Sequence, residues 1–153
     1  MRLDQLLGHF SYESVQGSHD LIITDICYHS GKVKRGSLFV CIKGQCTDGH
    51  DYIMDAVNAG AFAVVVDESC MVNVRWECFI YTGHGKVRVH ELVRNYGMAV
   101  IGVKDTRQVL AQISAAFYDY PAKKLKMIGI TGTKGKTTTA FLTAGILKEA
   151  GYK

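Results

Sequence analysis

The sequence lacks the features that mark several classes of protein. No cysteine pair has C-x-x-C spacing and the five cysteines are odd in number, which argues against a disulfide framework and a zinc site. The longest nearly pure apolar stretch, residues 59–66, is far shorter than the roughly 20 residues of a membrane-spanning helix. No secretory signal is visible in the first ten residues. We therefore expect free thiols in the reducing cytoplasm and no membrane partner.

The net charge is also small. Eighteen basic against fourteen acidic residues give a net charge of +4, and no dense Lys/Arg tract with interleaved aromatics suggests a nucleic-acid partner. The mild excess suits an anionic ligand such as a nucleotide, but also an ordinary solvated surface. With 48% hydrophobic and 21% charged residues, the composition is that of a globular protein rather than a collagen-like or disordered chain.

Apolar spacing predicts an α/β domain over residues 1–120. The runs 38–42 and 62–66 suit strands buried on both faces, and helical spacing between them implies a parallel crossover. Asp105 is positioned to cap a helix that continues to Phe117. Further elements are expected as strands at 21–26 and 98–103 and as helices at 2–7 and 52–59. The stretch 71–96 is ambiguous, with a strand at 78–81 and either helix or strand at 87–93.

The proline-containing stretch 120–124 is predicted to be a linker to a second domain over residues 121–153. Here we expect a strand at 126–131, a Gly-rich turn and a helix to residue 150. One strand–loop–helix unit cannot cover both faces of a sheet, so this domain is expected to be begun and not finished. Its uncovered apolar face predicts a sticky or dimeric chain and is expected to consist of Phe141, Leu142, Ile146 and Leu147.

The Gly-rich turn has the character of a phosphate-binding loop. Two glycines allow the backbone to approach phosphate oxygens, and Lys136 would reach the β- and γ-phosphates of ATP while the Thr137 hydroxyl binds Mg²⁺. Ile130 stands where the general pattern G-x-x-x-x-G-K-[ST] has glycine, so an ordinary Gly/Lys turn is the alternative. The residues expected to bind ATP are Gly132, Thr133, Lys134, Gly135, Lys136, Thr137 and Thr138.

The narrower form T-G-T-K-G-K-T-T, residues 131–138, resembles the loop of the Mur ligase family. Upstream, G-S-L-F-V-C-I-K-G at 36–44 and D-G-H-D-Y-I at 48–53 resemble the N-terminal domain of MurE- and MurF-type ligases. D-T-R at 105–107 and A-A-F-Y at 115–118 are closer to the MurE type. Folylpolyglutamate synthases have a similar loop but usually end it in G-K-G-S.

The resemblance implies an ATP-dependent amide ligase of peptidoglycan precursor synthesis. Such enzymes add a diamino acid, diaminopimelate or lysine, to UDP-MurNAc-L-Ala-D-Glu through an acyl phosphate, with Lys136 as the catalytic lysine. The UDP moiety would lie in the N-terminal domain against Tyr28, Ser30, Gln45, Cys46 and Thr47. The usual signature D-S-R-x-V reads His29-Ser30-Gly31-Lys32-Val33 here, so the roles of its Asp and Arg are not filled.

Three alternatives stay open at this point. Besides the MurE type, the chain is compatible with part of a MurF-type ligase or with a non-catalytic module that binds UDP-muramoyl peptides. A P-loop ATPase or kinase is disfavoured, because no apolar run ending in Asp follows the loop. Since the family's remaining catalytic parts come after the loop helix, we expect the 153 residues alone to be inactive. Oligomeric state is not set by the sequence.

Overall fold

The computed structural model describes residues 1–74 and 77–152. The chain divides into two compact units, Met1–Tyr120 and Pro121–Lys153. Residues 75 and 76, within the ambiguous stretch 71–96, and residue 153, the end of the second segment, lie outside the described residues.

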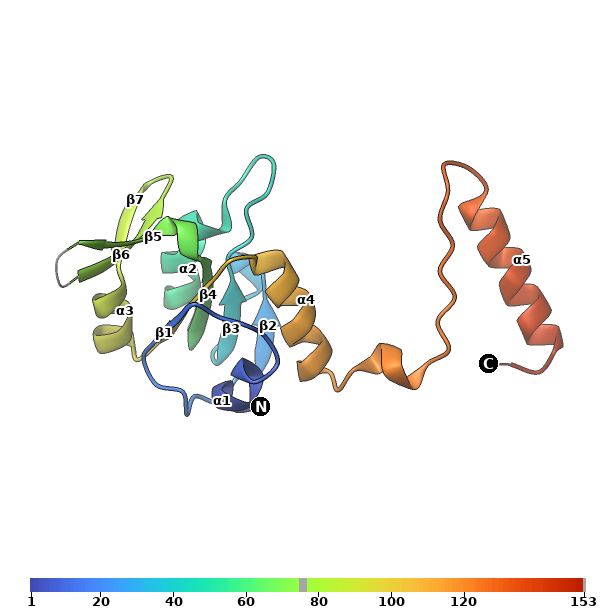
Figure 1. The fold of residues 1–153 in the computed structure, drawn as a ribbon, viewed down its shortest axis with the longest axis horizontal. Helices are drawn as coiled ribbons and strands as arrows, with labels where there is room; N and C mark the ends of the chain where they lie inside the picture. Colours follow the sequence, from blue (N-terminus) through green and yellow to red (C-terminus); the bar gives the residue numbers. More distant parts are fainter. Residues whose placement is uncertain (75–76, 153) are drawn as a thin grey trace. The chain divides into compact units, whose positions relative to one another are not determined.

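A five-stranded sheet forms the centre of the first unit, in the order β1-β8-β4-β3-β2 (Figure 1). The strands β2, β3, β4 and β8 run parallel to their neighbours, and β1 pairs antiparallel with β8. The parallel β3–β4 pair confirms the predicted crossover. The bounds are β1 (Ser14–Gln16), β2 (Asp25–Cys27), β3 (Ser37–Val40), β4 (Ala63–Asp67) and β8 (Ala99–Val103). The strand expected at 21–26 thus begins later than its pattern suggested.

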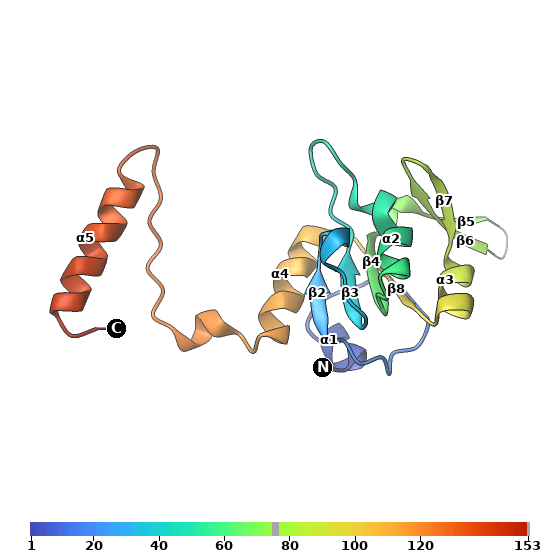
Figure 2. The same cartoon turned by 180° about the vertical axis from the view of Figure 1, so that it is seen from behind.

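Both faces of this sheet are apolar, because successive side chains of a strand point to opposite faces. One face packs Leu38, Val65 and Ile101 against α1 (Leu3–Leu7) and α4 (Thr106–Phe117). The other packs Phe39, Val64 and Val100 against α2 (Ile53–Asn58) and α3 (Val89–Tyr96). Figures 1 and 2 show the sheet from its two sides. Every residue of β3 and β8 is buried, as continuous apolar runs predict.

The ambiguous stretch forms a second sheet followed by a helix. The strands β5 (Met71–Val74), β6 (Glu77–Thr82) and β7 (Gly85–Arg88) pair antiparallel in that order. The run 87–93 is divided between two elements: Val87 lies in β7, and α3 begins at Val89. Ile80 of β6 and Leu92 of α3 are fully buried in the core beneath the main sheet. This meander therefore completes one face of the first unit.

In the second unit the prediction of a strand at 126–131 is wrong. The unit contains the short helix η4 (Pro121–Lys124) and the helix α5 (Lys136–Glu149), and residues 126–131 form no strand. The physical reason is that a strand is made by its ladder of hydrogen bonds, and the described part of this unit offers no second strand. The helix is confirmed, and it ends in a Schellman motif: Tyr152 N–H donates to Leu147 O and Gly151, at φ +83°, donates to Lys148 O.

The apolar face expected on α5 is present. Taken by itself, the second unit leaves Phe141, Leu142 and Ile146 between 64% and 76% exposed, whereas Leu147 is half-buried. Dimerisation through this face stays a prediction. Among residues 1–74 and 77–152, no helix is both long and apolar enough to cross a membrane.

Hydrogen exchange should distinguish the paired strand β4 from the unpaired segment 126–131. We expect the amides of β4 to exchange slowly, because they are paired and buried, and those of residues 126–131 to exchange at nearly the rate of an unfolded chain. Slow exchange at 126–131 in dilute solution would contradict the unpaired state of that segment.

Candidate functional site

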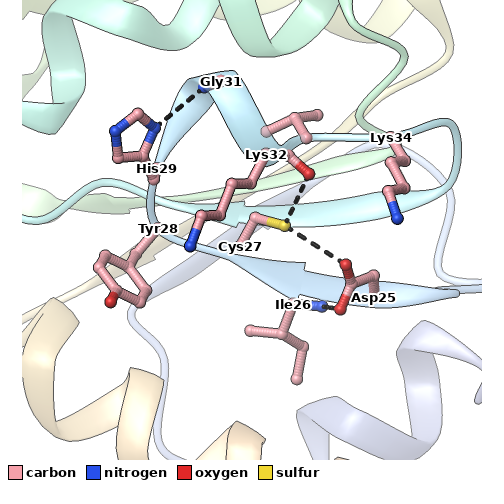
Figure 3. A pocket seen from close by; sticks show the side chains of 9 residues that line it. Asp25, Ile26, Cys27, Tyr28, His29, Gly31, Lys32 and Lys34 are labelled. Atoms are coloured by element: carbon pink, nitrogen blue, oxygen red, sulfur yellow. Dashed lines mark hydrogen bonds between the residues drawn. The ribbon is translucent and has the colours of Figure 1, made fainter.

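The first unit has three adjoining hollows beside β2 and the loops that follow β2 and β3. The central hollow, about 240 Å³, is lined by Tyr28, His29, Ser30, Phe39, Ile42, Thr47, Gly49 and Tyr52. The lysine hollow, about 540 Å³, shares Tyr28 and His29 and is otherwise lined by Asp25, Ile26, Cys27, Gly31, Lys32, Val33 and Lys34 (Figure 3). The hairpin hollow, about 430 Å³, shares Thr47 and Tyr52 and is otherwise lined by Lys43, Gly44, Gln45, Cys46, Asp48, Asp51 and His84.

The five residues expected to bind the UDP moiety all line these hollows. Tyr28, Ser30 and Thr47 lie together in the central one, and Gln45 and Cys46 extend the same wall into the hairpin hollow. Carboxyl ends of parallel strands are where open α/β sheets bind ligands. Sequence reasoning missed Phe39, Ile42 and Tyr52, although Phe39 and Ile42 both belong to the apolar run 38–42.

The projecting loop after β3 is a tight hairpin (Figure 1). Lys43 and Asp48 form an antiparallel bridge, and Gly44 N–H donates to Thr47 O at 2.8 Å, so Gln45 and Cys46 occupy the tip. Arg107 Nη2 donates to Lys43 O at 2.7 Å and ties the base of this loop to the first turn of α4. Asp105 caps the same turn by accepting the N–H groups of Arg107 and Gln108, each at 2.9 Å, which confirms the predicted cap.

A buried histidine joins this loop to the sheet. His50 is 1% exposed; its Nδ1 lies 2.5 Å from Asp48 Oδ1, and its Nε2 accepts the N–H of Asp67 at 3.0 Å. Nε2 therefore carries no proton, and Nδ1–H donates to the carboxylate. Beside it Gly49 leaves no room for a side chain, since an added Cβ would lie 2.6 Å from Ile42 N. Asp48, Gly49 and His50 therefore pack tightly together at the edge of the central hollow, which Gly49 lines.

His29, which stands where the family signature has Asp, has a local structural role. Its Nδ1 accepts the N–H of Gly31 at 3.1 Å and so begins the η1 turn (Ser30–Lys32), which places Ser30 half-buried in the central hollow. An added Cβ at Gly31 would lie 3.3 Å from the His29 ring. Within the described ranges, no group of three His, Cys, Asp or Glu residues is arranged to hold a metal ion.

The antiparallel meander reaches the site through its turn. Gly83 N–H donates to Asp51 Oδ1, and His84 Nε2 lies 3.9 Å from Asp51 Oδ2. His84 thereby becomes part of the wall of the hairpin hollow, although it is 32 or more residues distant in sequence from that hollow's other residues. No motif in the sequence indicates this contact.

The second unit presents the glycine-rich loop as a separate feature. Gly132 and Gly135 have φ of +146° and +78°, values that favour glycine, and α5 begins directly afterwards at Lys136. The Nζ of Lys136 donates to Gly132 O at 2.5 Å, so its ammonium group lies over the loop. First-turn amides of a helix have no intrahelical acceptor and are available to an anion. These donors fit the phosphates of a nucleotide, and the Thr137 hydroxyl is of the type that binds Mg²⁺.

Comparison with known proteins agrees with this arrangement. The profile described as "Mur ligase family, catalytic domain" matches residues 22–118. The chain belongs to the Mur ligase family. It is 36% identical over its full length to the UDP-N-acetylmuramoyl-L-alanyl-D-glutamate–2,6-diaminopimelate ligase of Cytophaga hutchinsonii. Over 99% of its length it is 39% identical to the ligase of the same name from Bacillus velezensis.

The chain spans about a quarter of these relatives, 27% and 26% of their lengths. Solved Mur ligases share the fold. MurF from Acinetobacter baumannii matches 83% of this chain and 22% of its own, at 26% identity and a TM-score of 0.53. MurF from Thermotoga maritima, solved in complex with ADP, matches 86% of this chain and 25% of its own, at 25% identity and a TM-score of 0.50.

Replacing His50 should show how strongly the loop depends on it. His50→Ala leaves the Asp67 N–H without its acceptor and opens a cavity, so we expect a loss of roughly 3 kcal/mol in the free energy of unfolding. Urea denaturation measures this loss. The exposed His90→Ala is the matched control and should change stability by less than about 0.5 kcal/mol. Equal losses of stability in both variants would contradict this role of His50.

Acid should release the same contact. Burial raises the pKa of the Asp48 carboxyl, but hydrogen bonds from the His50 backbone and ring outweigh it and hold that pKa below its ordinary 3.8. The carboxylate's stabilisation is therefore complete above pH 3.8 and is lost as the pH falls through the lower folded-state value. Asp48→Asn should be less stable than the parent at pH 7, and the difference should shrink below pH 3.8. A pH-independent difference in urea midpoints would rule this out.

Proposed function

We propose that the chain is the N-terminal part of a MurE-type ligase, which adds a diamino acid to UDP-MurNAc-L-Ala-D-Glu in peptidoglycan precursor synthesis. The observation that supports this most is the gathering of Tyr28, Ser30 and Thr47 in one hollow at the strand ends. The curated relatives are named as diaminopimelate ligases and share 34–39% identity with this chain. The solved MurF ligases share 25–26%, which favours the MurE type over the MurF type.

In this proposal the first unit, residues 1–120, is the UDP-binding domain. The aromatic ring of Tyr28, 64% exposed, offers a face to the uracil, and the Ser30 hydroxyl hydrogen-bonds the uridine diphosphate portion. Gln45, Cys46 and Thr47 contribute the hairpin wall, and Arg107 positions that hairpin by holding Lys43 O. The ligand is thus bound by a loop fixed at its base and open at its tip.

The second segment, residues 121–153, begins the ATP-binding domain. The residues that would hold ATP are Gly132, Thr133, Lys134, Gly135, Lys136, Thr137 and Thr138. ATP supplies the phosphoryl group that activates the substrate carboxylate. The chain's own contribution is charge neutralisation by Lys136, whose Nζ would exchange the Gly132 carbonyl for phosphate oxygens, while Thr137 would ligate Mg²⁺. Because the chain spans about a quarter of the length of its curated relatives, we expect the 153 residues to bind ATP without completing the reaction.

Calorimetric titration tests the two sites separately. UDP-MurNAc-L-Ala-D-Glu should bind the chain, and Ser30→Ala should weaken that binding roughly tenfold through loss of a hydrogen bond to a charged group. ATP with Mg²⁺ should bind independently and lose at least about tenfold affinity in Lys136→Ala. Ser18→Ala, an exposed serine of the first unit, and Lys148→Ala, at the other end of α5, are the matched controls.

The outcomes have separate meanings. Failure of the parent chain to bind the uridine compound, with ATP binding intact, would refute the MurE-type proposal and leave a generic nucleotide-binding chain. ATP turnover by the 153 residues alone would favour the ATPase alternative. Binding of the uridine compound without turnover is the expected result.

A further inference from the structure

The first unit ends in two residues with an unusual backbone. Among residues 1–74 and 77–152, Asp119 and Tyr120 are the only residues other than glycine with a positive φ, +57° and +50°. Side chains of L-residues adopt this left-handed region at a cost, because Cβ crowds the following carbonyl oxygen. Tyr120 also precedes Pro121, and a residue before proline favours extended backbone. We call Asp119 and Tyr120 the boundary pair.

The backbone of the boundary pair ends α4 in a Schellman motif. Asp119 N–H donates to Ala116 O at 3.0 Å, and Tyr120 N–H donates to Ala115 O at 2.6 Å. The helix α5 ends in the same motif, but there Gly151 holds the positive φ, which glycine adopts without strain. Thus α4 keeps, through its aspartate, a strain that α5 avoids.

Contacts of the Tyr120 side chain offset this strain. The ring is half-buried and packs against the core cluster to which Leu6 and Ile113 belong. Its Oη lies 2.9 Å from His9 Nδ1, and the two rings meet edge to face with centroids 5.9 Å apart. Since His9 lies in the turn that follows α1, Tyr120 joins the end of α4 to that turn. Strained residues persist only where such surrounding contacts hold them.

We propose that the boundary pair is a conformational switch that sets the length of the linker to the second unit. In the closed state Tyr120 lies against His9. Opening breaks the two backbone hydrogen bonds and the Tyr120–His9 contact, and relaxes both residues to extended backbone. It lengthens the linker by two residues, or roughly 7 Å. The stored strain lowers the free energy of opening, so the pair opens while the rest of the first unit stays folded.

The switch has a consequence for the proposed ligase. Its two ligands bind different units, and the linker limits how far apart or how near they can be held. An open boundary pair therefore gives the ATP-binding segment a longer reach. This consequence alone rests on the proposed function.

Amide hydrogen exchange of the 153-residue chain without ligands tests whether the opening is local. The Tyr120 amide should exchange faster than the Ile113 amide in the middle of α4, and its rate should not change at low urea concentrations. The rate of Ile113 should rise with urea, because that amide opens with the unit as a whole. An identical rate and urea dependence at both amides would overturn the proposal.

Variants test whether strain and the His9 contact control the opening. Asp119→Gly and Asp119→Ala both remove the carboxylate and differ in the cost of a positive φ, so the residue-120 amide should exchange roughly fivefold more slowly in the glycine variant. Tyr120→Phe keeps the ring but loses the hydrogen bond to His9, and should accelerate this exchange roughly fivefold. Tyr118→Phe, which removes an exposed hydroxyl two residues away, is the matched control and should stay within twofold of the parent.

The remaining outcomes are equally distinct. Equal rates in the glycine and alanine variants, or a parental rate in Tyr120→Phe, would overturn the switch. Because these measurements contain no nucleotide, they do not depend on the proposed function. A chain that shows the expected exchange but fails to bind UDP-MurNAc-L-Ala-D-Glu would retain the switch and lose the MurE-type function.

Discussion

The burial of both faces of the main sheet is the constraint on which the first unit depends. Side chains such as Leu38 and Phe39 alternate between two apolar layers, each closed by helices. Polar chemistry is therefore excluded from the faces and confined to the strand ends. At the ends of β2 and β3 the chain uses a short turn and a hairpin, and these create the three adjoining hollows.

Hydrogen bonds from distant parts of the chain fix these loops. His50 connects Asp48 to the end of β4, Arg107 holds the base of the hairpin, and the Gly83 amide binds Asp51. Each contact lies behind the hollows or at their edges, so the open walls keep their side chains for a ligand. The meander and the helix α3 that follows it have two structural roles here: Ile80 and Leu92 fill the core, and the turn of the meander brings His84 to the hairpin hollow.

Much of this arrangement could be predicted from the sequence, for identifiable reasons. The apolar runs that became β3 and β4 and the Asp105 cap are local patterns, and the structure confirms them. The strand at 126–131 could not be judged from its residues, because a strand also needs a partner elsewhere. The Gly83–Asp51 contact depends on tertiary placement, which no periodicity encodes. The roles of Tyr28, Ser30 and the ATP loop stay predictions.

The central claim is that a uridine nucleotide binds the first unit at the strand ends and that ATP binds the loop of the second. Amide chemical-shift mapping of the labelled 153-residue chain tests both halves in one sample. UDP should shift amides within 28–34 and 42–52 and leave 132–139 unchanged, and a subsequent addition of ATP with Mg²⁺ should shift 132–139. Shifts from UDP confined to 132–139 would contradict the account.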